Sequence, residues 1–284
     1  MADIAQPRQA LLARESVASR GERHSFHFIF GFLGFSAAIL LAAPTVIVLI
    51  TSFTNGYSLK FPPPGYSVRW YVALLANSPE IAEATWISLK IAVASTAIGV
   101  LLSVAAGLVL ARRRAAWARV LDSVFMSPLM LPLLAIGLAL LVMFSRLGIE
   151  LSMTTLIIGH IVITTPYILR TTIANYVQLD PVLLESARAL GARPWFAFRT
   201  VTLPLIVPGI AAGAFIAFMA SFDNVAISLF LSDARTQVLP IKLWNIIESS
   251  LDVRAAAASG VLIVATIILA LVMERVAGLS RHMR

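Results

Sequence analysis

The chain has 284 residues, of which 59% are hydrophobic and 13% are charged, and its formal net charge is +8. Soluble domains average about 45–50% apolar and about 25% charged residues, so this composition excludes an ordinary soluble domain and predicts a membrane protein. Cysteine is absent, which excludes disulfides, a thiol nucleophile and a cysteine-ligated metal site.

Six apolar runs are long enough to cross a bilayer, which requires about 20 mostly apolar residues per helix. In chain order, the predicted spans are Phe28–Thr51, Trp86–Ala111, Asp122–Ser145, Ser152–Ile173, Leu205–Leu231 and Ala256–Glu274. A hydrophilic tail of residues 1–25 precedes them, and residues 26–284 form one six-helix transmembrane domain. The predicted fold is therefore an all-α, polytopic membrane protein.

The basic residues predict how these spans are oriented. Fifteen of the 22 Lys and Arg residues lie in the tail, the two loops after spans two and four, and the C-terminal segment. Six lie in the alternate loops, and Lys90 lies within span two. Because cytoplasmic loops carry the excess of basic residues, both termini are predicted to be cytoplasmic. The same distribution explains the basic charge without nucleic acid as a partner.

Two features of the spans predict a kinked, tightly packed bundle. Prolines lie within or beside several spans, where neighbouring helices can satisfy the freed carbonyls; they are Pro44, Pro128, Pro132, Pro166 and Pro208. Small residues are abundant in Ser103–Ala111 and Gly209–Ser221, which allows helix backbones to approach closely.

The loop of residues 178–204 is polar but rich in aromatic residues. Asp180-Pro181 is typical of a helix start, and Gly191 is typical of a helix end. A second short helix is predicted from about Pro194. The apolar faces of these two helices require a cover, and the residues alone leave two alternatives open. One cover is the membrane interface and the other is a groove on a partner protein.

The spacing in this loop resembles the signature of permease subunits of ABC importers, which reads Glu-Ala-Ala, three residues, Gly, nine residues, Ile, any residue, Leu-Pro. Here it reads Glu185-Ser186-Ala187, then Gly191, then Val201-Thr202-Leu203-Pro204, with Ser186 replacing alanine and Val201 replacing isoleucine. The resemblance implies a cytoplasmic coupling helix between spans four and five that docks into an ATPase subunit. The implied ATPase-coupling residues are Glu185, Ser186, Ala187, Gly191, Leu203 and Pro204.

The same resemblance implies the location and partners. It implies a multi-pass protein of the bacterial inner membrane, paired with a second permease subunit that is identical or different. Two ABC ATPase subunits and a periplasmic substrate-binding protein complete the assembly. The chain lacks the phosphate-binding motif G-x-x-x-x-G-K-[ST], so ATP and Mg are expected on the partner ATPase, and no cofactor or catalytic residue is expected here.

Four further segments resemble spermidine/putrescine permease subunits: Ser67–Leu75, Met126–Pro132, Ser221–Leu231 and Leu239–Ile263. This narrower resemblance implies a polyamine or a related cation as cargo. Other small solutes stay open, including an amino acid derivative, an organophosphonate, thiamine or iron. An ion-coupled secondary transporter is a further alternative, for which several coupled acids or broken helices are expected.

Polar residues inside the spans are the candidates for the substrate pathway, because intramembrane ionisable groups usually face a cavity. The candidates are Asp223, Asn224, His160, Thr164 and Tyr167. Each has a structural alternative: Asp223 can pair with a neighbouring helix, and His160 can donate to one. The scattered histidines predict no metal site.

Overall fold

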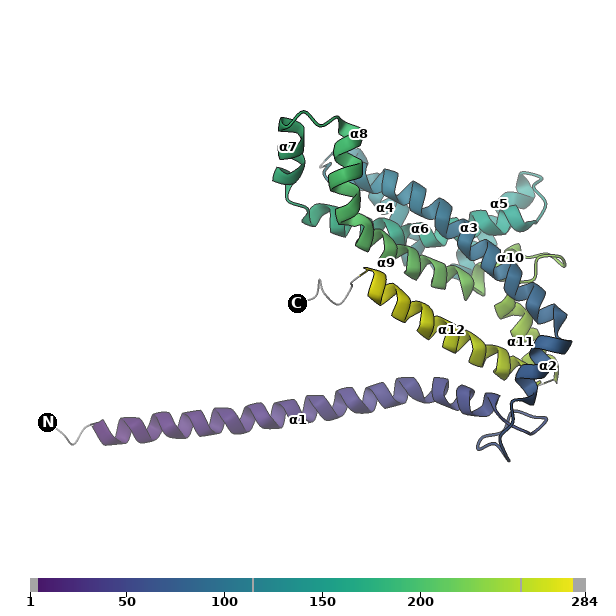
Figure 1. The fold of residues 1–284 in the computed structure, drawn as a ribbon, viewed down its shortest axis with the longest axis horizontal. Coiled ribbons are helices and arrows are strands. Elements are labelled where there is room, and N and C mark those ends of the chain that lie inside the picture. The colour runs from purple at the N-terminus through teal and green to yellow at the C-terminus, as the bar shows by residue number, and fades with distance from the viewer. Residues whose placement is uncertain (1–4, 114, 251, 278–284) are drawn as a thin grey trace.

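The computed structural model describes residues 5–113, 115–250 and 252–277, with side chains described within residues 26–275. The described chain is almost entirely helical (Figure 1). Its helices are α1 (Ala5–Ser52), α2 (Arg69–Asn77), α3 (Pro79–Leu110), α4 (Ala116–Met130), α5 (Leu133–Arg146), α6 (Met153–Gln178), α7 (Pro181–Ala189), α8 (Pro194–Ala197), the π-helical turn η1 (Phe198–Thr202), α9 (Leu203–Phe222), α10 (Ala226–Leu231), α11 (Leu239–Ser250) and α12 (Val253–Ala277).

The helices confirm an all-α polytopic membrane protein. Five described segments are long and apolar enough to span a membrane, from α1, α3, α6, α8 to α9, and α12. A sixth span is formed only if α4 and α5 are counted together, and they are bent by 109°.

Two of the spans were predicted as continuous helices, and this prediction was wrong. The run Asp122–Ser145 is divided at Leu131-Pro132, because proline has no N–H to donate and forces the residue before it into an extended conformation. Leu131 accordingly has φ −98° and ψ 146°. The run Leu205–Leu231 is divided between Phe222 and Ala226, so that α10 is a separate short helix.

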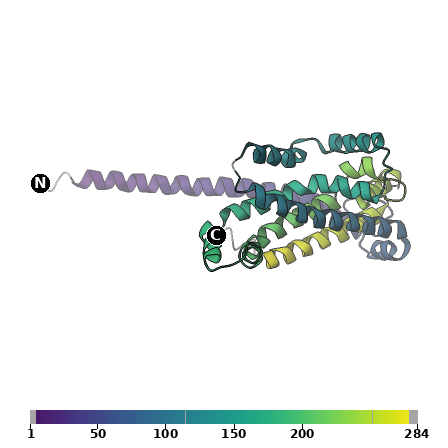
Figure 2. The same cartoon turned by 90° about the horizontal axis from the view of Figure 1, so that it is seen from above.

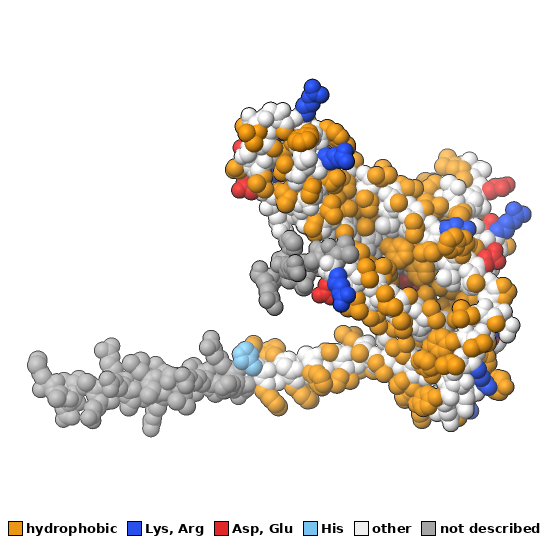
Figure 3. Space-filling view, in the orientation of Figure 1, with side chains coloured by type: hydrophobic (Ala, Val, Ile, Leu, Met, Phe, Trp, Pro, Cys, Tyr) orange, Lys and Arg blue, Asp and Glu red, His pale blue; other side chains and the backbone are white. Residues whose placement is uncertain are grey.

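The core of the molecule is the packing of α3, α6 and α9 on one another. Figure 2 shows α4 and α5 along one side of this group, where α4 contacts α6 and α5 contacts α10. On another side, α12 packs against α1, α2 and α9. Large apolar side chains remain exposed over the outer helices (Figure 3), as expected where lipid or another membrane subunit forms the surroundings.

The two ends of the bundle differ. The loop containing α7 and α8 lies at the same end as the last turn of α12 and the N-terminal part of α1, whereas α2 and α11 lie at the opposite end (Figure 1).

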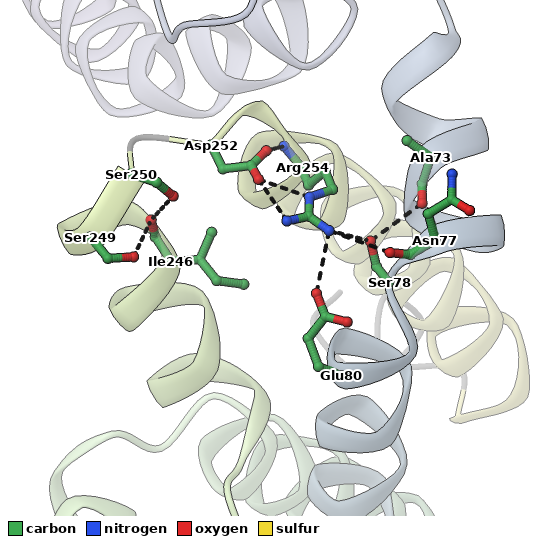
Figure 4. A network of polar contacts seen from close by, with 9 residues as sticks. All are labelled: Ala73, Asn77, Ser78, Glu80, Ile246, Ser249, Ser250, Asp252 and Arg254. Atoms are coloured by element: carbon green, nitrogen blue, oxygen red, sulfur yellow. Dashed lines mark hydrogen bonds and ion pairs between the residues drawn. The ribbon is translucent and has the colours of Figure 1, made fainter.

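An ion-pair network fastens the end that carries α2 and α11 (Figure 4). The Arg254 guanidinium at the start of α12 contacts Asp252 (Nη2 to Oδ2, 2.8 Å) and Glu80 on α3 (Nη1 to Oε1, 3.3 Å). Its Nη1 also donates to the Ser78 hydroxyl at 3.1 Å and to the Asn77 carbonyl at 3.4 Å. One side chain thus joins α12 to the corner between α2 and α3.

Candidate functional site

The first candidate site is the loop between α6 and α9. Its first helix, α7, begins as the sequence predicts: Asp180 Oδ1 accepts from the backbone N–H of Val182 at 2.9 Å, and Pro181 occupies the first turn. Such a cap stabilises a helix by about 1 kcal/mol. The start of α7 is therefore encoded locally by two adjacent residues.

The end of α7 is fixed by Gly191, which adopts φ +82°. The N–H of Ala192 donates to the Ala187 carbonyl at 3.1 Å, and the N–H of Gly191 donates to the Arg188 carbonyl at 2.9 Å. These two bonds form a Schellman motif, in which a left-handed residue satisfies the last carbonyls of a helix. Gly191 is thus required by the backbone rather than by a side-chain contact.

The second half of the loop runs without interruption into the core. α8 begins at Pro194, as expected, and continues through η1 into α9. At that junction the N–H of Leu203 donates to the carbonyl of Phe198, five residues earlier, and Pro204, which follows, has no N–H. Leu203 and Pro204 therefore connect the loop to a central helix.

Apolar side chains of the loop are exposed. Leu190 is 89% exposed, Trp195 69% and Phe196 61%, while Glu185 and Ser186 are exposed beside them. A shallow cavity of about 500 Å³ lies between α7 and η1, lined by Ala187, Leu190, Gly191, Ala192, Arg193, Phe196, Thr200 and Val201. Of the residues that the sequence predicts for ATPase coupling, Ala187 and Gly191 line this cavity, and Glu185 and Ser186 are exposed earlier on α7.

Arg112, in the turn after α3, anchors the start of this loop. Its guanidinium carbon lies 4.7 Å from the centroid of the Tyr176 ring near the end of α6. Its Nη2 also lies 3.5 Å from the carbonyl oxygen of Leu179, the residue that ends α6. The loop is therefore held at its beginning by a cation–π contact and at its end by continuity with α9.

The second candidate site comprises the polar residues of the spans, beginning with His160. Its side chain is 1% exposed and is hydrogen-bonded to two serines: Nδ1 lies 2.7 Å from Ser221 Oγ on α9, and Nε2 lies 3.1 Å from Ser228 Oγ on α10. The hydroxyl of Thr164, also buried, donates to the His160 carbonyl at 2.8 Å. The His160 side chain thus joins α6 to α9 and α10, whereas the Thr164 hydroxyl bonds within α6.

The break between α9 and α10 contains Asp223 and Asn224. Asn224 is buried, and its Oδ1 accepts from the N–H of Ile227 at 2.8 Å, which caps the first turn of α10. Asp223 ends α9, and its side chain is exposed on the surface of the chain. The expectation that Asp223 lies within a continuous span was therefore wrong, because it lies at a helix break.

Two helix breaks meet at one small cavity of about 170 Å³. Its lining comes from both sides of the α4–α5 break, from α6, and from the α9–α10 region: Pro128, Leu129, Leu131, Leu133, Ile163, Tyr167, Ala220 and Asn224. Of the five pathway candidates, the structure brings only Tyr167 and Asn224 together here. Asp223 is adjacent in sequence but is not part of the lining.

Sequence reasoning missed the serines of the core. Ser95 Oγ lies 3.1 Å from Ser221 Oγ, so that α3 joins the hydrogen bonds of His160. Ser95, Ser221 and Ser228 are at most 3% exposed. The only available signal was a hydroxyl within an apolar run, which is common in membrane helices. Within the described residues, no three His, Asp or Glu side chains gather as a metal site would require.

Comparison with known proteins identifies the family of this chain. The family described as "Binding-protein-dependent transport system inner membrane component" matches residues 99–280. The spermidine/putrescine transport system permease protein PotC of Escherichia coli K12 is 28% identical over 86% of this chain and 92% of its own. The putrescine transport system permease protein PotI of the same strain is 30% identical over 81% of this chain and 83% of its own.

Solved structures share the fold. A chain of a bacterial ABC transporter involved in the import of the acidic polysaccharide alginate superposes with a TM-score of 0.68, at 16% identity, over 92% of this chain and 98% of its own. A chain of the MetNI methionine ABC transporter gives a TM-score of 0.58 at 17% identity, over 69% of this chain and 94% of its own. Because the family match spans most of the helical core, the chain belongs to the inner membrane components of binding-protein-dependent transport systems.

Proposed function

We propose that this chain is the permease subunit of an ATP-driven importer in the bacterial inner membrane, and that α7 docks on a partner ATPase. The observation that carries the proposal is the exposed apolar surface of residues 183–196, a range that also includes the exposed Glu185. A solvent-facing tryptophan, phenylalanine and leucine on two short helices have the composition of a docking element. In this proposal the ATPase, not lipid, covers that surface.

The connection between loop and core supports a mechanical role. α8, η1 and α9 follow one another without a flexible linker, and α7 contacts both α8 and η1. A displacement of α7 would thus reach α9 and the break at Asp223–Asn224. Nucleotide binding by two ATPase subunits would favour one arrangement of the bundle, and release would favour the other, which is alternating access as a population shift.

The assembly requires further partners. A second permease chain, identical or different, would complete the pathway, and in this proposal the exposed Asp223 faces the space between the two chains. A periplasmic binding protein would approach the end that carries α2 and α11. The alginate neighbour has been solved in complex with its substrate-bound periplasmic protein.

We infer that the cargo is a polyamine or a related small organic cation. PotC and PotI are named for spermidine and putrescine, and the present chain aligns with most of each. Tyr167 on α6 and Asn224 line the cavity at the paired helix breaks, and the exposed Asp223 carboxylate precedes Asn224 in the chain. An acid and an aromatic ring both favour an ammonium group.

Purification and reconstitution test the docking. Because the chain has no cysteine, Ser186→Cys introduces a unique thiol on α7. We expect it to form a cross-link to a co-purifying ATPase subunit, and labelled spermidine to enter proteoliposomes only with ATP. A matched Ala234→Cys variant, with its thiol in the exposed α10–α11 loop, should form no such cross-link. Ser186→Cys that reacts with no subunit of the assembly would contradict the docking.

The two helix breaks favour a second candidate function, an ion-coupled secondary transporter, because such transporters bind substrate at broken helices. Vesicles that contain this chain alone distinguish the two. Uptake driven by a proton or sodium gradient without any ATPase would favour the secondary transporter, and uptake that requires the ATPase would favour the importer.

A further inference from the structure

The hydrogen bonds of His160 carry an inference about the α9–α10 break. The imidazole on α6 contacts one hydroxyl on each side of the break: Ser221 belongs to the last turn of α9, and Ser228 belongs to α10. All three side chains are at most 3% exposed. No water competes for these groups at such burial, so each lost hydrogen bond leaves a polar atom unsatisfied.

The chemistry of the imidazole suits this position. A neutral imidazole has one N–H donor and one acceptor nitrogen, and each serine hydroxyl can donate and accept. Ser221 is hydrogen-bonded in turn to Ser95 on α3 at 3.1 Å, and Ser95 donates to the Ala92 carbonyl at 3.3 Å. Because Ser95 donates to Ala92, Ser221 donates to Ser95, Nδ1–H of His160 donates to Ser221, and Ser228 donates to Nε2. The Nδ1–H tautomer therefore gives a connected chain of hydrogen bonds from α3 through α9 and α6 to α10.

The geometry links the imidazole to the break itself. Ser221 and Ser228 are seven residues apart, and in a continuous α-helix their Cα atoms would be about 10.5 Å apart along the axis. If both serines had the same rotamer, their hydroxyls would be separated by that same distance. One imidazole with a hydrogen bond at each nitrogen is too short to span it. The contacts seen here are made across the interruption between α9 and α10.

We propose that His160 is a positioning residue that clamps α9 and α10 and thereby fixes the turn formed by Asp223 and Asn224. The clamp leaves Asn224 free to cap α10 through the N–H of Ile227 and keeps Asp223 exposed on the outside of the turn. That this turn lines the cargo pathway rests on the proposed function. The clamp itself rests only on the contacts of His160.

Hydrogen exchange of the purified full chain tests the clamp directly. Ser228→Ala removes one hydrogen bond and should speed amide exchange in α10 (Ala226–Leu231) by about fivefold, the factor that one typical hydrogen bond corresponds to. His160→Ala removes two and should speed it by at least that factor. Combining the two substitutions should give little increase over His160→Ala alone, because His160→Ala already removes the contact with Ser228. Ser228→Ala removes only a hydroxyl, so it tests the proposal even if His160→Ala does not fold.

Ser103→Ala is the matched control. It also removes a buried hydrogen bond between helices, from Ser103 on α3 to the Thr165 carbonyl on α6 at 3.1 Å, but it touches neither side of the break. Its α10 amides should exchange at the parental rate. Unchanged α10 exchange in Ser228→Ala, or an equal rise in Ser103→Ala, overturns the clamp.

Transport measurements on the reconstituted assembly separate the clamp from the proposed function. If both hold, Ser228→Ala raises the KM for spermidine, whereas Ser103→Ala, which should lower the melting temperature by a similar amount, leaves the KM unchanged. If exchange rises but the parental assembly transports no cation, the clamp holds and the proposed cargo fails. If exchange does not change while parental transport is ATP-driven, the clamp fails alone.

Discussion

Gly213 on α9 faces the backbone of Ile168 on α6 so closely that a β-carbon added to the glycine would lie 2.8 Å from the Ile168 Cα. The same atom would collide with the Thr171 hydroxyl. A backbone atom cannot move aside as a flexible side chain can. The contact between these two central helices therefore depends on a residue without a side chain.

Gly213→Val should consequently destabilise the bundle, because overpacking a filled site costs about 1–3 kcal/mol. We expect a lower melting temperature in detergent and a smaller monodisperse fraction on size exclusion. Gly34→Val is the matched control, since nothing lies within 4 Å of a β-carbon at that position in α1. Equal melting temperatures for the two variants would contradict the close contact between α6 and α9.

Gly191 gives a second prediction, in which the backbone conformation, rather than packing, determines which substitutions are tolerated. An added β-carbon would meet nothing within 4 Å, so only the positive φ of 82° is a constraint. Asparagine tolerates this conformation, whereas a β-branched residue does not. Gly191→Asn should retain most ATP-driven uptake, and Gly191→Val should lose most of it while the melting temperature changes little. Equal uptake by both variants would show that the α7 end does not need its left-handed residue.

Local chemistry determined how well each element could be predicted. The boundaries of α7 followed from Asp180, Pro181 and Gly191, because a cap and a left-handed turn are encoded by adjacent residues. The break at Leu131-Pro132 could not be predicted, since a membrane helix can either kink at a proline or end there. Which occurs depends on whether neighbouring helices satisfy the freed backbone groups.

Long-range contacts explain the rest of what the sequence did not predict. His160 meets Ser221 and Ser228, which are 61 and 68 residues away, and nothing in the local pattern identifies these partners. The break at Asp223–Asn224 contains no glycine or proline and is stabilised by the Asn224 side chain on the next helix. An apolar run interrupted by two polar residues therefore resembled one continuous span.

The sidedness of the bundle provides a third prediction. Ser186→Cys and Ala234→Cys each introduce a unique exposed thiol into the cysteine-free chain, at opposite ends of the helical bundle (Figure 1). In intact cells whose outer membrane is permeabilised, an impermeant maleimide should modify Ala234→Cys, but should reach Ser186→Cys only after the inner membrane is disrupted. The parental chain serves as the blank. The reverse pattern would place the α7 loop outside the cell and exclude its docking on an ATPase.

Arg254 gives a fourth prediction, on stability. Its side chain joins Asp252 and Glu80 and also donates to the corner between α2 and α3. Because its ion pairs are partly exposed, Arg254→Gln should cost only about 1 kcal/mol, less than a fully buried pair would. The loss should shrink in 1 M NaCl, where exposed charges are screened. A difference in melting temperature that is independent of salt would assign the effect to hydrogen bonding instead.

The last prediction concerns the acid at the helix break. Asp223→Asn keeps the size of the side chain but removes its charge and replaces one acceptor oxygen with an NH2 donor, so it should raise the KM for spermidine more than for a neutral solute. Glu150→Gln is the matched control, because it neutralises an exposed acid in the α5–α6 loop, away from the break. A charge that acts only by raising the general concentration of cations near the membrane would make the two variants alike, and both effects would vanish in high salt. A local interaction with an ammonium group would leave a salt-resistant defect in Asp223→Asn alone. Uptake kinetics that match the parental chain at every salt concentration would place Asp223 outside the path of the cargo.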